Sequence, residues 1–127
     1  MLPPNEPKRK IQRHEDLVVW QKAMDLVIES YRLAQRLPLN EQYGLASQIR
    51  RASVSVPANI AEGFGRWHKK EFLRFLLLAN GSLKELETHL EIGKRLSFFA
   101  SSELTKALKI ADEVGRMITS LRGKLDH

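Results

Sequence analysis

The sequence predicts an all-α protein, an up-and-down antiparallel four-helix bundle. Apolar residues recur with helical periodicity along most of the 127 residues, and no window alternates like a β-strand. Short polar breaks divide this pattern into four long segments, and short connections place sequential helices antiparallel. With 43% apolar residues, the chain can build a core without metals or disulfides. We expect one domain at residues 15–127, preceded by a flexible basic tail at residues 1–14.

The first two helices are placed by their boundary residues. The first is expected to begin at residues 15–16, whose carboxylates suit a helix N-terminus, and to end at Leu37 before a proline. Asn40 is the predicted N-cap of the second helix, which runs from Glu41 toward Gly63.

The last two helices follow short breaks in the pattern. The third helix is expected from Lys69 to about Ser97. The fourth follows Ser101 as its N-cap, carries Glu103 in its first turn and runs to about Leu125.

The stretch SVPANIAEGFGR, Ser55 to Arg66, interrupts the second helix with a proline and two glycines. Pro57 removes one backbone donor and crowds the carbonyl of Ser53, so we expect a continuous second helix kinked at Pro57. The glycines lack the third glycine of a dinucleotide fingerprint and the G-K-[ST] of a Walker loop. Helix packing is therefore preferred over a phosphate cradle. Gly81, inside the third helix, is likewise expected at a close helix crossing.

The first helix carries more apolar surface than one bundle needs. One apolar stripe consists of Leu17, Trp20, Met24, Val27, Ile28 and Tyr31. The second stripe consists of Val19, Ala23, Leu26, Leu33 and Leu37. The third helix is apolar on every side near Phe72 to Leu78. Because self-association usually covers such surface, we predict a homo-oligomer, with an unusually apolar monomer core as the alternative.

Two motifs carry a resemblance to a known family. SVPANIAEGFGR at Ser55 and ANGSLKELETHL at Ala79 resemble the paired signature of four-helix-bundle proteins encoded in intervening sequences of bacterial 23S rRNA genes. The resemblance spans nearly the whole chain. It implies a homopentamer with no known catalytic activity and no established molecular function. At Asn80 the chain departs from the basic residue more usual in the family, which removes that local charge.

The chain is also similar in fold, size and basicity to the accessory variability proteins of diversity-generating retroelements. That second resemblance implies two kinds of partner, because those proteins bind a reverse transcriptase and nucleic acid.

Positive charge supplies the functional candidates. The net charge is +6 with a pI near 9.8, which favours acidic partners such as nucleic acid, although many bundles are basic only for solubility. The predicted phosphate-binding residues are Arg66, Lys69, Lys70 and Arg74 near the second turn, and Lys106, Lys109, Arg116 and Lys124 on one arc of the fourth helix. Trp67 can stack on a base or anchor the turn against the core, and the anchor is preferred.

Enzymatic chemistry has little support in the sequence. There is no cysteine, so thiol nucleophiles and zinc-thiolate sites are excluded and a reducing cytoplasm suits the chain. The Glu-x-x-His motif of di-iron bundles is missing, since Leu86 stands three residues before His89. Three acidic residues are candidates for catalytic groups: Glu62, Glu85 and Glu87. We interpret them instead as ion-pair partners of Arg50, Arg51 or Lys84 at helix contacts. We expect no catalytic residue, cofactor or metal.

Three functional classes remain. The first is a non-enzymatic homo-oligomer that binds RNA or DNA phosphates without sequence preference. The second is a scaffold or accessory factor for another protein, for example a reverse transcriptase. An enzyme is the third and has the least support. No apolar run is long enough to span a membrane, so we expect no membrane partner.

Overall fold

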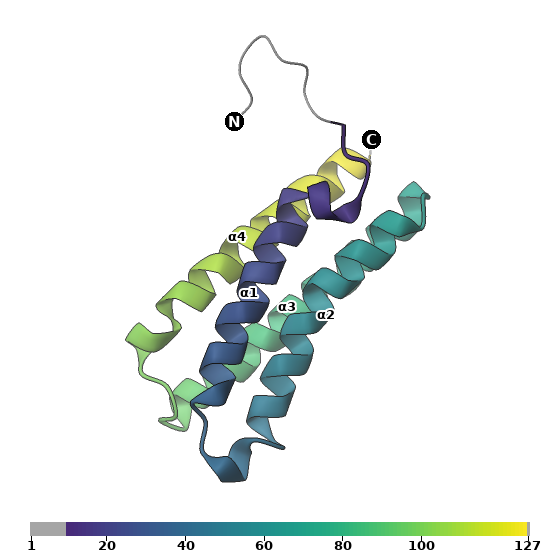
Figure 1. Ribbon diagram of the computed structural model, residues 1–127. Coiled ribbons are helices and arrows are strands. Elements are labelled where there is room, and N and C mark those ends of the chain that lie inside the picture. Colours follow the sequence, from purple (N-terminus) through teal and green to yellow (C-terminus); the bar gives the residue numbers. More distant parts are fainter. Residues whose placement is uncertain (1–9, 127) are drawn as a thin grey trace.

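A computed structural model describes residues 10–126, all of whose long elements are helices. The chain forms α1 (Val18–Gln35), α2 (Leu45–Gly65), α3 (Lys69–Arg95) and α4 (Ser101–Leu125), with 3-10 turns η1 (His14–Asp16) and η2 (Leu39–Glu41). The helices run alternately up and down (Figure 1). The predicted all-α, antiparallel four-helix bundle is confirmed. Residues 1–9 of the predicted basic tail lie outside the described part of the chain.

Each helix packs against two neighbours. α1 contacts α2 and α4, and α3 contacts the same two helices, so α1 and α3 lie at diagonally opposite corners. The α2–α3 interface is the most extensive in the bundle. The turn between α2 and α3 lies at the end of the bundle where α1 begins and α4 ends (Figure 1).

The core is aliphatic, as the helical periodicity predicts. Its completely buried large side chains come from all four helices and include Leu26, Ile49, Ile60, Leu76, Leu86 and Ile118. Burial of each such side chain contributes about 1.5–3 kcal/mol relative to exposure. Burial of this core is therefore the main favourable contribution to the folding of the bundle.

The first two helices begin later than predicted. Asp16 belongs to η1, where its carboxylate accepts the N–H groups of Gln12 and Arg13, each at 3.1 Å. Asn40 lies within η2 and caps no helix, which corrects the predicted start of α2. Gly44, with φ −105° and ψ −108°, separates η2 from α2 because its backbone is not helical.

The other boundaries are close to those predicted. α3 begins at Lys69 and ends at Arg95, two residues before Ser97, whose φ of 65° is left-handed and stops the helix. α4 includes Ser101 as its first residue, so the N-cap is Ala100. Glu103 stabilises this end by accepting the N–H of Ala100 at 2.8 Å.

The helix α2 is continuous through Pro57, as predicted. The hydroxyl of Ser53, which is buried, donates to the carbonyl oxygen of Arg50 at 2.9 Å. Whether Pro57 kinks the helix stays a prediction.

Two glycines on the α2–α3 hairpin have opposite surroundings. A Cβ at Gly63 would lie 2.5 Å from the Cβ of Phe75, so only glycine allows α2 and α3 to approach there. A Cβ at Gly81 would meet nothing within 4 Å. The expected close crossing at Gly81 is therefore wrong within a single chain.

The two apolar stripes of α1 also differ. The stripe formed by Val19, Ala23, Leu26, Leu33 and Leu37 is buried in the core. The other stripe keeps Met24, Ile28 and Tyr31 exposed, with Ile28 52% accessible. On α3, Leu77, Leu78 and Ile92 are exposed as well. The chain thus leaves apolar surface uncovered on two helices that do not touch each other.

Candidate nucleic-acid interface

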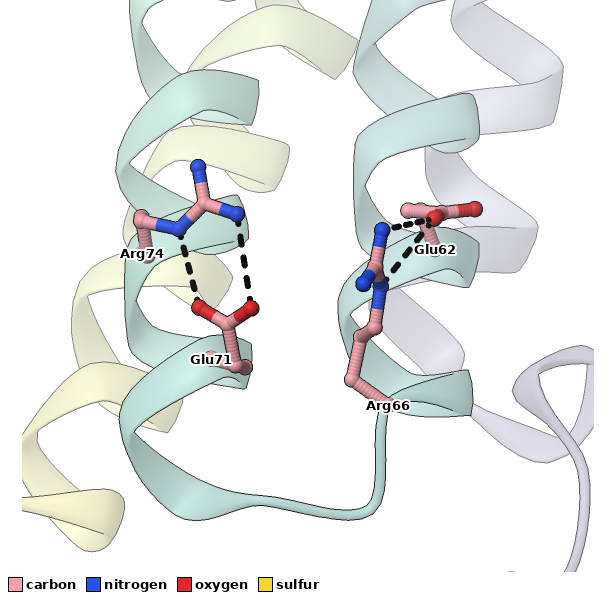
Figure 2. Close-up of polar contacts among 4 residues, drawn as sticks. All are labelled: Glu62, Arg66, Glu71 and Arg74. Carbon is pink, nitrogen blue, oxygen red and sulfur yellow. Dashed lines mark hydrogen bonds and ion pairs between the residues drawn. The ribbon is translucent and has the colours of Figure 1, made fainter.

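Four of the predicted phosphate-binding residues lie around the turn between α2 and α3. We call residues 62–75 the tip. Arg66 pairs with Glu62, with Nη2 2.7 Å from Oε1, and Arg74 pairs with Glu71, with Nε 2.9 Å from Oε2 (Figure 2). Both pairs join residues three or four positions apart on one helix. Neither pairing is predicted from the sequence, which favours Arg50, Arg51 or Lys84 as the partner of Glu62.

Both arginines lie over the same aromatic ring, that of Phe75. The guanidinium carbon of Arg66 lies 5.3 Å from the ring centroid of Phe75, and that of Arg74 lies 4.6 Å from it. The hydrogen bond from Arg74 lowers the pKa of Glu71, and the same bond raises the pKa of Arg74. Because these ion pairs are solvent-exposed, they contribute little to stability, and a phosphate can compete with the carboxylate.

The turn itself exposes Trp67 to solvent. The residue is 82% accessible, its φ is 64°, and its ring centroid lies 6.4 Å from that of Phe64. The preferred interpretation of Trp67 as an anchor against the core is therefore wrong. Lys69 and Lys70 are exposed beside it, and Lys70 has no carboxylate within ion-pair distance among residues 10–126.

A second basic region lies in a groove between α1 and α4, with a volume of about 470 Å³. We call it the α1–α4 groove, and Lys106 and Lys109 line it. Lys106 Nζ lies 3.0 Å from Glu29 Oε1, and Arg32 Nη1 lies 2.6 Å from the same oxygen. The hydrogen bond from Lys106 is the main cause that lowers the pKa of Glu29. Much of the positive charge of this groove is therefore neutralised by the chain's own carboxylates.

The remaining two candidates lie elsewhere on α4. Arg116 Nε is 2.9 Å from Asp112 Oδ2 and borders a separate groove between α3 and α4, together with Lys84 and Glu87. Lys124 lies near the C-terminal end of α4, close to Leu17 and Val18. One chain thus distributes the eight candidates over the tip and several faces of α4. Their binding to nucleic acid stays a prediction.

The acidic residues mostly pair along their own helices. Glu87 pairs with the predicted Lys84 at 3.2 Å, but Glu62 pairs with Arg66 and Glu85 lies 3.5 Å from His89. The expectation of Arg50 as their partner is wrong. Arg50 Nη2 instead donates to Gln42 Oε1 at 2.8 Å.

A polar contact connects the two sequence motifs. Ser55 Oγ on α2 and Ser82 Oγ on α3 are hydrogen-bonded at 2.8 Å. Asn59 Nδ2 donates to both Ser55 Oγ and the Ser55 carbonyl, at 2.9 and 2.8 Å. Helical periodicity alone does not reveal this contact, since it depends on the register between two helices. Its consequence is that the two motifs form one structural unit.

Neither a metal centre nor a membrane span is found in the part of the chain that the structure describes. Within residues 10–126, no three acidic or histidine side chains are grouped so that they could hold a metal ion. None of the helices in that range combines the length and apolar character needed to cross a membrane.

The family model described as 23S rRNA-intervening sequence protein matches residues 15–120, which include the first three long helices and most of α4. This chain belongs to that family. No functionally curated protein matches it.

A crystal structure of another protein has the same fold. The chain is similar to a protein of unknown function from the S23 ribosomal protein family of Bacteroides thetaiotaomicron, with a TM-score of 0.76 and 24% identity. The similarity covers 83% of this chain and 98% of the other. At this identity, the likeness establishes the bundle and no function.

Proposed function

We propose that this 23S rRNA-intervening sequence protein is a non-enzymatic homo-oligomer that binds RNA or DNA through phosphates, without sequence preference. The observation that carries the proposal is the tip, where Arg66, Lys69, Lys70 and Arg74 are all exposed around a single turn. The sequence of the tip, residues 62–75, contains these four cations and two carboxylates, Glu62 and Glu71. Clustered basic groups attract phosphates without distinguishing bases.

The uncovered apolar surface supports assembly into a ring. The exposed residues of α1, including Ile28 and Tyr31, and those of α3, including Leu77, lie on diagonally opposite helices. Two unlike faces on opposite sides of a subunit pair head to tail, and such contacts close into a ring when the rotation permits. Gly81 on α3 leaves open space where a helix of the next subunit can approach closely. The family resemblance favours five subunits.

Assembly would strengthen weak binding. One tip offers few phosphate contacts, so a single subunit binds weakly. A ring repeats the tip once per subunit, and several tips on one strand raise the overall affinity by effective concentration.

Fluorescence anisotropy with unrelated RNA and DNA oligomers at several salt concentrations tests the proposal. We expect the logarithm of the affinity to fall linearly with the logarithm of salt concentration, by roughly 0.7–0.9 per phosphate contact. Replacing Lys69 and Lys70 with alanine should flatten this slope without changing sequence preference. Each variant is first shown by light scattering to keep the parent's oligomeric mass.

Two results would overturn parts of this proposal. A mass near 14.6 kDa at micromolar concentration would contradict the oligomer. Absence of nucleic-acid binding at low salt would contradict the phosphate interface.

A second candidate is a scaffold or accessory factor for another protein, such as a reverse transcriptase. The observation in its favour is that Arg66, Arg74 and Arg116 are already paired with carboxylates of the chain. Retention of one specific protein at high salt, where phosphate binding is weak, would favour this alternative.

A further inference from the structure

Trp67 occupies a backbone position that disfavours its own side chain. Its φ of 64° is left-handed, directly after the C-cap Arg66 of α2, where glycine is the usual residue. Gly65 stands two positions earlier inside the helix, and a Cβ there would meet nothing within 4 Å. The chain therefore places its largest side chain at the strained position and glycine where none is needed. Such an outlier points to a function for the side chain.

Aromatic contacts support the exposed ring. Phe64 lies 6.4 Å from Trp67, with the ring planes at 40°, and Phe72 meets Phe64 edge-on at 5.8 Å. Phe72 in turn packs against the hydrophobic core. Trp67 is thus connected to the bundle through two phenylalanines, while 82% of its own surface stays open to solvent. This arrangement presents a flat aromatic surface at the end of the molecule.

The chemistry around the ring identifies the class of ligand. Arg66, His68, Lys69 and Lys70 are all exposed next to Trp67 in the sequence. An aromatic ring between cations suits a ligand with both flat bases and phosphates. A lipid surface fits less well, because Trp67 is the only large apolar side chain fully exposed at the turn between α2 and α3 in the described structure.

We propose that Trp67 is a base-stacking residue that makes the tip prefer single-stranded nucleic acid over duplex. This inference rests on the proposed nucleic-acid function. Bases of a single strand can leave their neighbours and stack on the ring, whereas those of a duplex are already stacked and paired. Lys69 and Lys70 then contact the phosphates on either side of the stacked base.

The test compares three short oligonucleotides of about eight nucleotides, within the site size of a small single-strand binding domain. They are a single strand, the duplex that it forms with its complement, and a strand of equal length in which every nucleotide lacks its base. The protein is the full chain, and Trp67→Ala is compared with Trp67→Phe, which keeps an aromatic ring. Because Trp67 is exposed, both variants should keep the parent's circular dichroism and oligomeric mass.

We expect Trp67→Ala to weaken binding of the single strand by at least about fivefold. Binding of the duplex and of the abasic strand should change less than twofold, since neither offers a free base. Trp67→Phe should keep most of the single-strand affinity. In a Trp20→Phe background, Trp67 is the only tryptophan, and its fluorescence should be quenched by the single strand but not by the abasic strand.

The outcomes separate this inference from the proposed function. Equal binding of the single strand by the parent and Trp67→Ala would overturn the stacking role while leaving phosphate binding intact. Equal loss on all three oligonucleotides would also overturn it, because the effect would then not depend on bases. If the parent binds none of them at low salt, the proposed function fails as well. Insertion of Trp67 into anionic vesicles, without single-strand preference, would assign the tip to lipid and reject the inference.

Discussion

The tip and the α1–α4 groove have similar basic sequences but different electrostatics. In the tip, the acidic partners are more accessible, with 53% of the Glu62 side chain and 35% of the Glu71 side chain open to solvent. In the groove, the side chain of Glu29 is only 14% accessible and is contacted by both Lys106 and Arg32. Ion pairs with a less exposed acid are screened less by solvent and exchange less readily with a ligand. Exposure of the acidic partner, more than the number of lysines and arginines, therefore distinguishes a phosphate site from a structural ion-pair cluster.

The largest effect is expected where the tip depends on close helix packing. Gly63→Ala would place a Cβ 2.5 Å from Phe75 Cβ and 3.1 Å from Phe72 Cδ1. We expect the free energy of unfolding to fall by about 1–3 kcal/mol, because one of the helices must shift. Urea denaturation followed by circular dichroism measures the change.

Gly65→Ala is the matched control, since its Cβ meets nothing within 4 Å. It should stabilise the chain by up to about 1 kcal/mol through helix propensity. Equal effects of the two substitutions would contradict the packing role of Gly63.

The next effect concerns binding and compares the two basic regions directly. Lys69→Ala with Lys70→Ala should lower nucleic-acid affinity and flatten its salt slope by up to about 1.8 per tip, since two phosphate contacts are lost. Lys106→Ala with Lys109→Ala should change the slope less, because Lys106 is already paired with Glu29. Anisotropy titrations at matched oligomeric mass measure both pairs. A larger loss from the α4 pair would reverse the assignment of the tip as the main site.

A smaller effect is expected on the stability of the fold at acidic pH. The pKa of Glu29 is lowered from its ordinary value of 4.5, chiefly by the hydrogen bond from Lys106. A lowered pKa in the folded chain means that the carboxylate stabilises the fold above pH 4.5 and loses this contribution as the pH falls through the lower folded value. Glu29→Gln should therefore cost about 1 kcal/mol at neutral pH and show a weaker loss of stability in acid.

Thermal unfolding between neutral and acidic pH measures this difference. Glu71→Gln in the tip is the control, and its effect should be smaller because Glu71 is more exposed than Glu29. A parent-like acid profile of Glu29→Gln would show that the groove ion pairs contribute nothing to stability.

The smallest expected effect is on stability and concerns the backbone strain at Trp67 in the tip. Trp67→Gly and Trp67→Ala both remove the ring, but only glycine adopts the left-handed φ without strain. We expect Trp67→Gly to be more stable than Trp67→Ala by about 0.5–1 kcal/mol. Calorimetry of the two variants measures the difference, and a more stable alanine variant would show that position 67 carries no strain.

Much of the fold could be predicted because it depends on local patterns. The start of α3 at Lys69 and the end of α4 at Leu125 agree with the apolar periodicity. The starts of α1 and α2 could not be predicted from apolar periodicity, because they depend on polar side chains that bond to backbone groups a few residues away. Gln42, for example, donates to the carbonyls of Ala34 and Leu37, which ends α1 and holds the connection outside α2.

The candidate site was predictable in position but not in detail. The basic cluster of the tip is visible in the sequence, whereas the exposure of Trp67 depends on the left-handed turn that follows α2. The pairing of Lys106 with Glu29 joins residues of α1 and α4, which no local pattern connects. Similarly, Gly81 has the sequence context of a buried crossing but faces open space, because the side of α3 that it occupies has no neighbour within the chain.

The extensive α2–α3 interface has a consequence for the order of folding. These two helices are joined by a short turn, so bringing them together costs little loop-closure entropy. The α1–α4 contact instead requires residues from the two ends of the chain to meet. Contacts that are close in sequence generally form faster than distant ones. We expect the α2–α3 hairpin to form first in the folding pathway, and the α1–α4 groove to close only when the last helix docks.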